Sequence, residues 1–360
     1  MKTKTAALLA FACFLSTAAE RASEPITESI EEIPTELFFK RPEVSSLLVS
    51  PNGEMVMAIN AHGIAIVDLA TMKRVHGFNY DQAQRRVGRI FWLTSERIMF
   101  EPFVDVGGGD ERPYVTGDFF AMNIDGSKSL RLFGGEDRRT LHQLISVLPH
   151  DPDHILVQGM TADMNLNSRP TAYIKNIHEK STSRSSRKPV GGPSPLPYSS
   201  LFADNAGQVR LAVGRTHERF SNVVMYRDDM KSEWIDITAI VAGADDAALP
   251  VASGADNASF YFLSRMNANT RGLYRFDTKE RTAELIYRDP DVDLAPGDLW
   301  WNTGRTKPVG ATLAKPVPQP VVFDPKDDTA RLYATLFKAF RGHLVRVTSQ
   351  SEDGSKAIFI

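Results

Sequence analysis

The sequence has 360 residues, 42% of them hydrophobic, and a formal net charge of −2 at neutral pH. A chain of this length and apolar content can bury a substantial core, and it lacks the basic surplus typical of nucleic-acid-binding proteins. Its single cysteine, Cys13, excludes an internal disulfide framework and a multi-cysteine metal site.

The N-terminal segment has the features of a secretory signal peptide. Lys2 and Lys4 precede an apolar run over residues 6–15, and small residues follow that run. The apolar run, about ten residues long, is too short for a membrane-spanning helix, which needs about twenty. We assign residues 1–22 to the signal peptide and expect cleavage after Ala19 or Ala22. The mature chain should be periplasmic or secreted, with no stable membrane span.

Short β-type runs, separated by Asn-Gly, Asp-Gly, Asp-Pro and Gly-Gly turns, fill the rest of the chain, and amphipathic helical segments of useful length are almost absent. Similar units recur about every 45 to 55 residues, close to the four strands of one propeller blade. Such blades stack side by side because one sheet cannot bury both of its faces alone. The predicted fold class is all-β, a β-propeller.

The blades can be placed by their strand and turn patterns. In the first unit, runs at residues 45–50, 55–59 and 64–68 predict three strands, a fourth is expected near residues 74–78, and Asn52-Gly53 marks the first turn. We expect the propeller over residues 36–360, with blades at approximately 36–80, 86–134, 140–197, 198–242, 247–292 and 298–341, and a partial seventh at 343–360.

The final run stops inside a strand pattern. An apolar strand without sheet neighbours exposes unpaired backbone groups. This favours a truncated chain.

A series of short motifs occurs in a fixed order through the mature sequence. They are Leu37–Pro42, Leu48–Gly53, Ile90–Leu93 with Arg97–Phe100, Val147–Pro152 with Ile155–Val157, Asp204–Arg210 and Ser349–Ser355. In order and spacing, they resemble the N-terminal propeller of bacterial secreted S9-family serine peptidases, the prolyl oligopeptidase and acylaminoacyl-peptidase group. The resemblance implies that an α/β-hydrolase domain with a Ser-Asp-His triad follows the propeller, which covers the active site and restricts entry to oligopeptide substrates.

No catalytic residue of that family can be assigned in this sequence. The nucleophile elbow reads G-x-S-x-G on a strand-to-helix turn, and that motif does not occur. The segment nearest to this motif is Gly191-Gly192-Pro193-Ser194-Pro195. Its prolines remove backbone donors, and no helical pattern follows it. The chain alone is therefore predicted to be inactive, and no cofactor is indicated.

Four other patterns favour ordinary turns or loops over binding sites. Asp289, Asp291 and Asp293 alternate as in a calcium loop but lack its glycine and distal glutamate. His150 and His154 have a spacing seen in helical metal pairs, but Pro152 between them argues against a helix. Residues 107–109, three glycines, lack the Lys-Ser/Thr that a phosphate-binding loop needs, and the basic run at 180–188 is typical of a solvated loop.

Six side chains are candidates for contacts with a peptide in the central channel: Arg215, Arg219, Arg265, Arg271, Trp300 and Trp301. Arginine and tryptophan are the residues that most often dominate binding surfaces. The competing interpretation is that the tryptophans pack between blades and the arginines are solvated.

The sequence leaves three functional hypotheses. The preferred one is the substrate-gating propeller of an exported serine peptidase acting on oligopeptides. The second is a free-standing periplasmic propeller that binds a protein or peptide, and the third is a fragment or frameshifted product. The coding sequence downstream of residue 360 distinguishes them.

Overall fold

The computed structural model describes residues 44–60, 63–80, 85–104, 114–115, 117–134, 140–161, 168–180, 187–216, 222–243 and 247–360. The predicted signal peptide, Cys13, Arg219, the glycines at 107–109 and most of the basic run at 180–188 lie outside these ranges. All elements below belong to one unit, residues 43–360.

Within the described residues, six antiparallel meanders follow one another along the chain. The first three sheets contain β1 (Ser46–Val49), β2 (Met55–Ile59), β3 (Gly63–Asp68) and β4 (Arg74–Asn79); β5 (Arg85–Thr94), β6 (Arg97–Val104), β7 (Tyr114–Val115), β8 (Phe119–Asn123) and β9 (Leu130–Phe133); and β10 (Thr140–Ser146), β11 (His154–Thr161), β12 (Thr171–Asn176) and β13 (Arg187–Pro193).

The next three contain β14 (Ser200–Ala203), β15 (Val209–Gly214), β16 (Val223–Tyr226) and β17 (Ile235–Asp236); β18 (Leu249–Ser253), β19 (Ser259–Ser264), β20 (Gly272–Asp277) and β21 (Thr282–Tyr287); and β22 (Leu299–Trp301), β23 (Pro308–Leu313) and β24 (Gln319–Val322). Short helices α2 (Thr238–Val241) and η4 (Pro296–Asp298), helix α3 (Asp328–Ala339) and a final hairpin of β25 (Val347–Gln350) and β26 (Ala357–Phe359) complete the unit.

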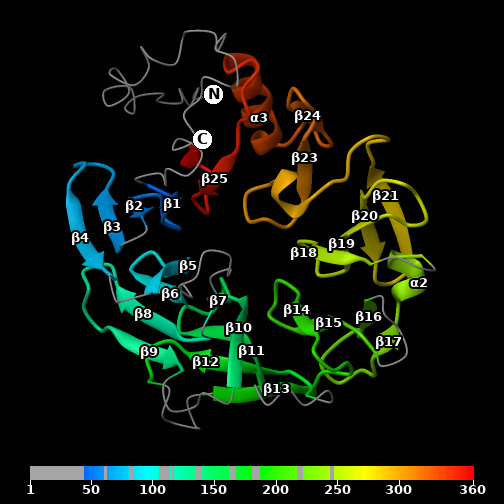
Figure 1. The fold of residues 1–360 in the computed structure, drawn as a ribbon, viewed down its shortest axis with the longest axis horizontal. Coiled ribbons are helices and arrows are strands. Elements are labelled where there is room, and N and C mark those ends of the chain that lie inside the picture. Colours follow the sequence, from blue (N-terminus) through cyan, green and yellow to red (C-terminus); the bar gives the residue numbers. More distant parts are fainter. Residues whose placement is uncertain are drawn as a thin grey trace, which may run out of the picture. The chain divides into compact units, whose positions relative to one another are not determined.

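The sheets are arranged around a centre, with the first strand of each sheet innermost. Figure 1 shows β1, β5, β10, β14 and β18 toward the inside of the ring and β4, β9, β13 and β21 toward the outside. This arrangement confirms the predicted all-β propeller, with six blades in the described part of the chain. The pairing also places the predicted fourth strand of the first blade at β4.

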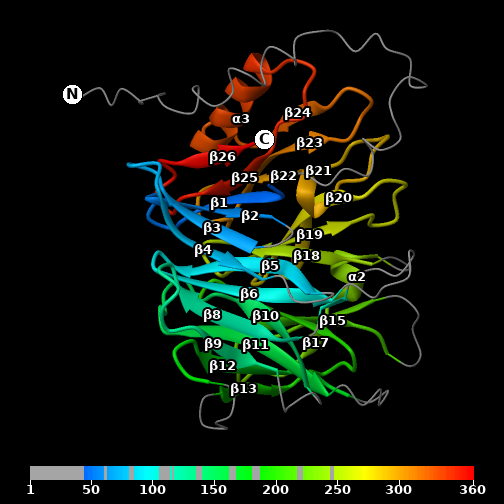
Figure 2. The same ribbon diagram turned by 60° about the vertical axis from the view of Figure 1, so that its left-hand side comes forward.

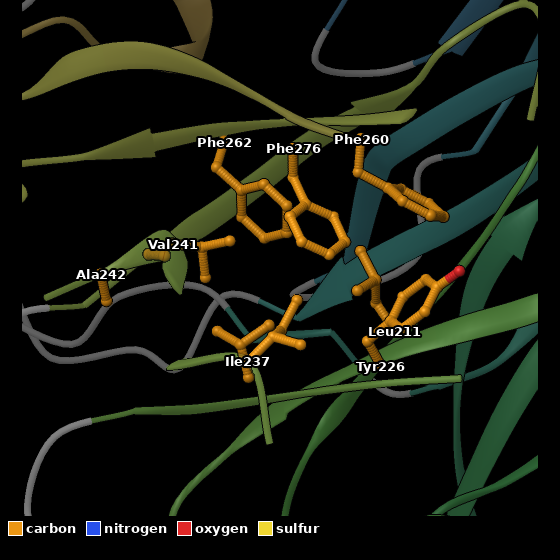
Figure 3. Packing of buried hydrophobic residues seen from close by; sticks show 10 residues of the cluster. Leu211, Tyr226, Ile237, Val241, Ala242, Phe260, Phe262 and Phe276 are labelled. Atoms are coloured by element: carbon orange, nitrogen blue, oxygen red, sulfur yellow. The ribbon is translucent and has the colours of Figure 1, made fainter. Parts of the chain in front are cut away.

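The hydrophobic core lies in layers between neighbouring blades rather than at one centre. One layer joins the fourth blade, through Leu211 and Tyr226, to the fifth, through Phe260, Phe262 and Phe276; Figure 3 shows these rings meeting edge to face. Equivalent layers lie between the other successive blades. The repeated β-type runs therefore specify the fold through the apolar faces that each blade presents to the next.

The turns between the first and second strands also link neighbours. Asn52 N donates to Ser95 Oγ (3.2 Å), from the first blade to the second, and Asn205 N donates to Asn257 Oδ1 (2.9 Å), from the fourth to the fifth. The final hairpin makes the same kind of contact, because the N–H of its turn residue, Glu352, donates to Pro51 O (2.8 Å). Figure 2 shows β25 and β26 beside β1.

Buried arginines add side-chain links between blades. Arg97 Nη2 donates to Ile177 O (2.8 Å), and Arg227 Nη1 donates to Gly191 O (2.9 Å). Arg210, 7% exposed, donates to Asn257 O on the fifth blade, and its guanidinium lies 3.5 Å from Asp204. Charge-assisted bonds to buried carbonyls are stronger than neutral ones, so these links help fix each blade against the next.

Helix α3 is an amphipathic helix that the sequence interpretation did not place, although the described residues are otherwise almost entirely strands and turns, as expected. It begins after Asp327, whose side chain accepts from Thr329 N (2.9 Å) as an N-cap. Its buried face, Ala330, Tyr333 and Leu336, repeats every three residues and covers the sixth blade. This cap and period were readable in the sequence, but the regular strand-and-turn pattern on both sides obscured them.

Candidate functional site

Three of the arginines predicted to contact a peptide lie in equivalent segments of two neighbouring blades. Arg215 follows β15, and Arg265 and Arg271 lie between β19 and β20. Both segments join the second strand of a blade to the third, and successive blades share one topology, so the two segments lie on the same face of the propeller. Arg219, predicted to act with them, lies outside the described residues.

Arg265 and Arg271 converge on one carboxylate. Arg265 Nη2 lies 2.8 Å from Asp293 Oδ2, and Arg271 N donates to Asp293 Oδ1 (2.7 Å). The hydrogen bond from the Arg271 backbone and then that from Arg265 lower the pKa of Asp293. Asp293 thus fixes the connection between β19 and β20 instead of belonging to a calcium loop.

Arg215 lines a cavity of about 520 Å³ between the fourth and fifth blades. Tyr198, Phe202 and Leu249 form its apolar wall, and Arg215 Nε lies 3.5 Å from Asn222 Oδ1. A mixed aromatic and cationic wall suits a peptide ligand. The structure does not bring Arg215 into the same cavity as the tryptophans.

The two adjacent tryptophans point to opposite faces of β22, as the alternation of a strand requires. Trp300, 2% exposed, stacks on Tyr333 of α3 (centroids 4.2 Å apart, planes at 4°) and donates from Nε1 to Thr312 Oγ1 (2.9 Å). Trp301 packs toward the fifth blade and lines a second cavity. Trp300 is thus a packing residue, as the competing interpretation expected, whereas Trp301 lines a cavity.

This second cavity, of about 510 Å³, lies between β22, the turn after it, helix α3 and β25. We call it the Arg305 cavity; its lining includes Leu299, Trp301, Arg305, Tyr333, Val347 and Glu352. Both β22 and β25 are terminal strands of their sheets, so each presents an edge without a strand partner among the described residues. Such an edge can pair with an extended peptide.

Arg305 is a candidate site residue that the sequence interpretation did not include. It lies in the β22–β23 turn, and its guanidinium is 5.5 Å from the centre of the Trp301 ring, within cation–π range. Partial desolvation lowers the pKa of Arg305, although the residue as a whole is exposed. In the sequence, its place in a turn shortly after Trp301 was only a weak signal of a binding site, because other arginines of the chain occur in similar turns.

The acidic and histidine patterns have structural roles. Lys315 Nζ lies 3.0 Å from Asp289 and 3.8 Å from Asp291, and His154 Nδ1 lies 2.9 Å from Asp151. In the described ranges, no three His, Cys, Asp or Glu side chains gather as a metal site would require. Nor is any helix of the described residues long and apolar enough to cross a membrane.

The serine nearest to a nucleophile motif is buried. Ser194 is 2% exposed, and its hydroxyl bonds to Ser199 Oγ (2.5 Å) and accepts from Leu196 N (3.2 Å). A nucleophilic serine must instead be exposed and bonded to a base. This serine therefore belongs to the packing of the third and fourth blades.

No protein-family profile matches the sequence, and no curated protein matches it. Solved structures do match. A prolyl endopeptidase is 10% identical with a TM-score of 0.50, and the match covers 75% of this chain and 39% of that one. The fold shared with it is a β-propeller. The likeness, at this identity, concerns the fold alone.

Two other solved structures are similar at lower scores. Dipeptidyl peptidase 4 of Porphyromonas gingivalis is 12% identical over 89% of this chain and 50% of that one, with a TM-score of 0.47. TolB of Acinetobacter baumannii is 14% identical over 67% of this chain and 53% of that one, with a TM-score of 0.36. The chain thus spans about half, or less, of the length of these three proteins.

Proposed function

We propose that this chain is the substrate-restricting propeller of an exported serine peptidase acting on oligopeptides. The observation that carries the proposal is a fold shared with a prolyl endopeptidase, together with the ordered motifs from Leu48–Gly53 to Ser349–Ser355. Cavities bordered by aromatic and cationic side chains, Trp301 with Arg305 and Phe202 with Arg215, add support because they suit peptide chemistry.

The propeller restricts substrates by size. Packed layers between blades resist deformation, because protein interiors are close-packed and have low compressibility. A peptide can pass along the inner strands in an extended form, whereas a folded protein is too wide. In the complete enzyme, a serine, a histidine base and an oxyanion hole outside this chain carry out acyl transfer through a serine ester.

A free-standing binding propeller is the second candidate. It needs no catalytic residue, and Ser194, the serine nearest to a nucleophile motif, is buried. In this alternative, the same cavities bind a peptide or protein without cleaving it. The two candidates differ in whether the native polypeptide also contains a hydrolase domain.

Mass spectrometry of the native polypeptide separates them. An antibody raised against residues 247–360 recovers the protein from the source organism, and peptides are mapped along the recovered chain. The proposal expects α/β-hydrolase peptides with a G-x-S-x-G serine on the same polypeptide, and an N-terminus within about residues 20–23. A native polypeptide without such a domain supports the binding propeller instead.

A further inference from the structure

Within the described residues, the cation of the Arg305 cavity forms no ion pair, although Glu352 also lines the cavity. Some other arginines near the surface pair with carboxylates: Arg265 with Asp293, Arg275 with Asp277 and Arg281 with Asp228. Arg305 has no carboxylate within ion-pair distance among the residues that the structure describes. Arg305 is exposed, so its guanidinium is accessible to a ligand that enters the cavity, and a bound carboxylate would form charge-assisted hydrogen bonds with it.

The turn that carries Arg305 is firmly held. Arg305 N donates to Asn302 O (2.9 Å), and Asn302 Oδ1 accepts from Thr306 N (2.9 Å) and Lys307 N (2.8 Å). Gln350 Nε2 of β25 donates to Thr303 Oγ1 (3.0 Å), which ties the turn to the opposite side of the cavity. The guanidinium therefore projects from a preorganised support, which reduces the entropy cost of binding.

Tyr333 supplies a second polar group at the same place. Its hydroxyl accepts from Val347 N (2.9 Å), which leaves its own proton to donate. Burial raises the pKa of Tyr333, while the hydrogen bond from Val347 and the positive charges of Arg305 and Arg346 act in the opposite direction. The cavity thus combines positive potential with a neutral donor.

The remaining walls select among anions. Leu299, Trp301 and the ring of Tyr333 provide apolar surface for a side chain. Glu352 on the rim is exposed and disfavours a doubly charged ligand such as phosphate, but it can accept from a peptide N–H. A singly charged carboxylate attached to a peptide meets all of these groups, and the free edges of β22 and β25 can pair with its backbone.

We propose that the Arg305 cavity binds the C-terminal carboxylate of a short peptide, with Arg305 as the charge partner and Tyr333 as a second donor. The proposal rests on the proposed function, since it names the end of the oligopeptide that the propeller recognises. In the peptidase, this contact would hold the C-terminal end of the substrate at the wall of the channel.

Calorimetric titration of the full chain with two peptides tests the site. The probes are the tetrapeptide Ala-Ala-Ala-Phe with a free C-terminus and the same peptide as its C-terminal amide. We expect the acid to bind about ten- to a hundredfold more tightly than the amide, because amidation removes a charge-assisted pair. The substitution Arg305→Gln should bring the two affinities together, and Arg305→Lys should retain a smaller preference because the charge remains but the planar fork is lost.

Arg341→Gln is the matched control, because Arg341 is exposed and does not line the cavity. It should leave the preference for the acid unchanged, and the melting curve of each variant shows that it is folded. Equal affinity of the unaltered chain for both peptides, no binding of either, or a preference that survives Arg305→Gln would overturn the proposal. Acetate binding as tightly as the acid peptide would also overturn it, by showing a general carboxylate site. None of these outcomes bears on whether a hydrolase domain shares the native polypeptide.

Discussion

Replacing Phe276 by alanine should destabilise the propeller strongly, because this ring joins two blades. Phe276 is fully buried and meets Tyr226 of the fourth blade (centroids 5.6 Å apart, planes at 73°) and Phe262 of its own blade (6.4 Å, 85°). Truncating a buried phenylalanine costs about 3–5 kcal/mol, and the edge-to-face pairs add about 0.5–1.5 kcal/mol each beyond buried area. We therefore expect a loss near the upper end of that range, about 4–5 kcal/mol.

Equilibrium unfolding in urea, followed by circular dichroism, measures the change. A domain is stable by only about 5–15 kcal/mol, so the midpoint should fall by about a quarter or more. Leu285→Ala on β21 is the control: its side chain is 47% exposed, and a surface change of this kind alters stability by about 0.5 kcal/mol or less. A loss below about 1 kcal/mol for Phe276→Ala would refute the view that layers between blades hold the ring together.

Two further substitutions test other links in the ring. Arg210→Met should cost about 3–5 kcal/mol in the same urea assay, because it leaves the buried Asp204 without its charge partner; an unchanged midpoint would show that the arginine link is dispensable. Hydrogen bonds from Ser351 and Ser355 lower the pKa of Asp353 from its ordinary value of 3.8 to about 2, so its contribution to stability is present above pH 3.8 and is lost as the pH falls toward 2. Asp353→Asn should therefore make the melting temperature less dependent on pH across that window, and a pH profile identical to that of the unaltered chain would contradict the assignment.

The fold was largely readable in the sequence because a propeller repeats one local pattern. Turns such as Asn52-Gly53 and Asn205-Ala206-Gly207 mark where the first strand of a blade returns as the second, and alternating apolar residues mark the faces that pack between blades. Helix α3 was missed because its signals are local and weak. Its role depends on the stacking of Tyr333 on Trp300, a contact between segments 33 residues apart that periodicity cannot reveal.

The site was harder to predict than the fold. Residue type directed attention to Trp300 and Trp301 together, but strand alternation places only Trp301 at the Arg305 cavity. Arg265 looked like a free cation in sequence and forms an ion pair with Asp293 in the structure. Arg305 acquires its significance only from its neighbours, Trp301 and Tyr333, which the fold brings to it from a strand and a helix.

Labelling of the native protein with a fluorophosphonate tests the central proposal most directly, because this probe reacts with an activated serine. Extract of the source organism is treated with the probe, and the propeller is recovered with an antibody against its sixth blade. The account predicts that the label is on the recovered polypeptide and is lost after heat denaturation. A recovered propeller that carries no label, in an extract whose other serine hydrolases are labelled, would contradict the peptidase assignment and leave the binding propeller as the function of this chain.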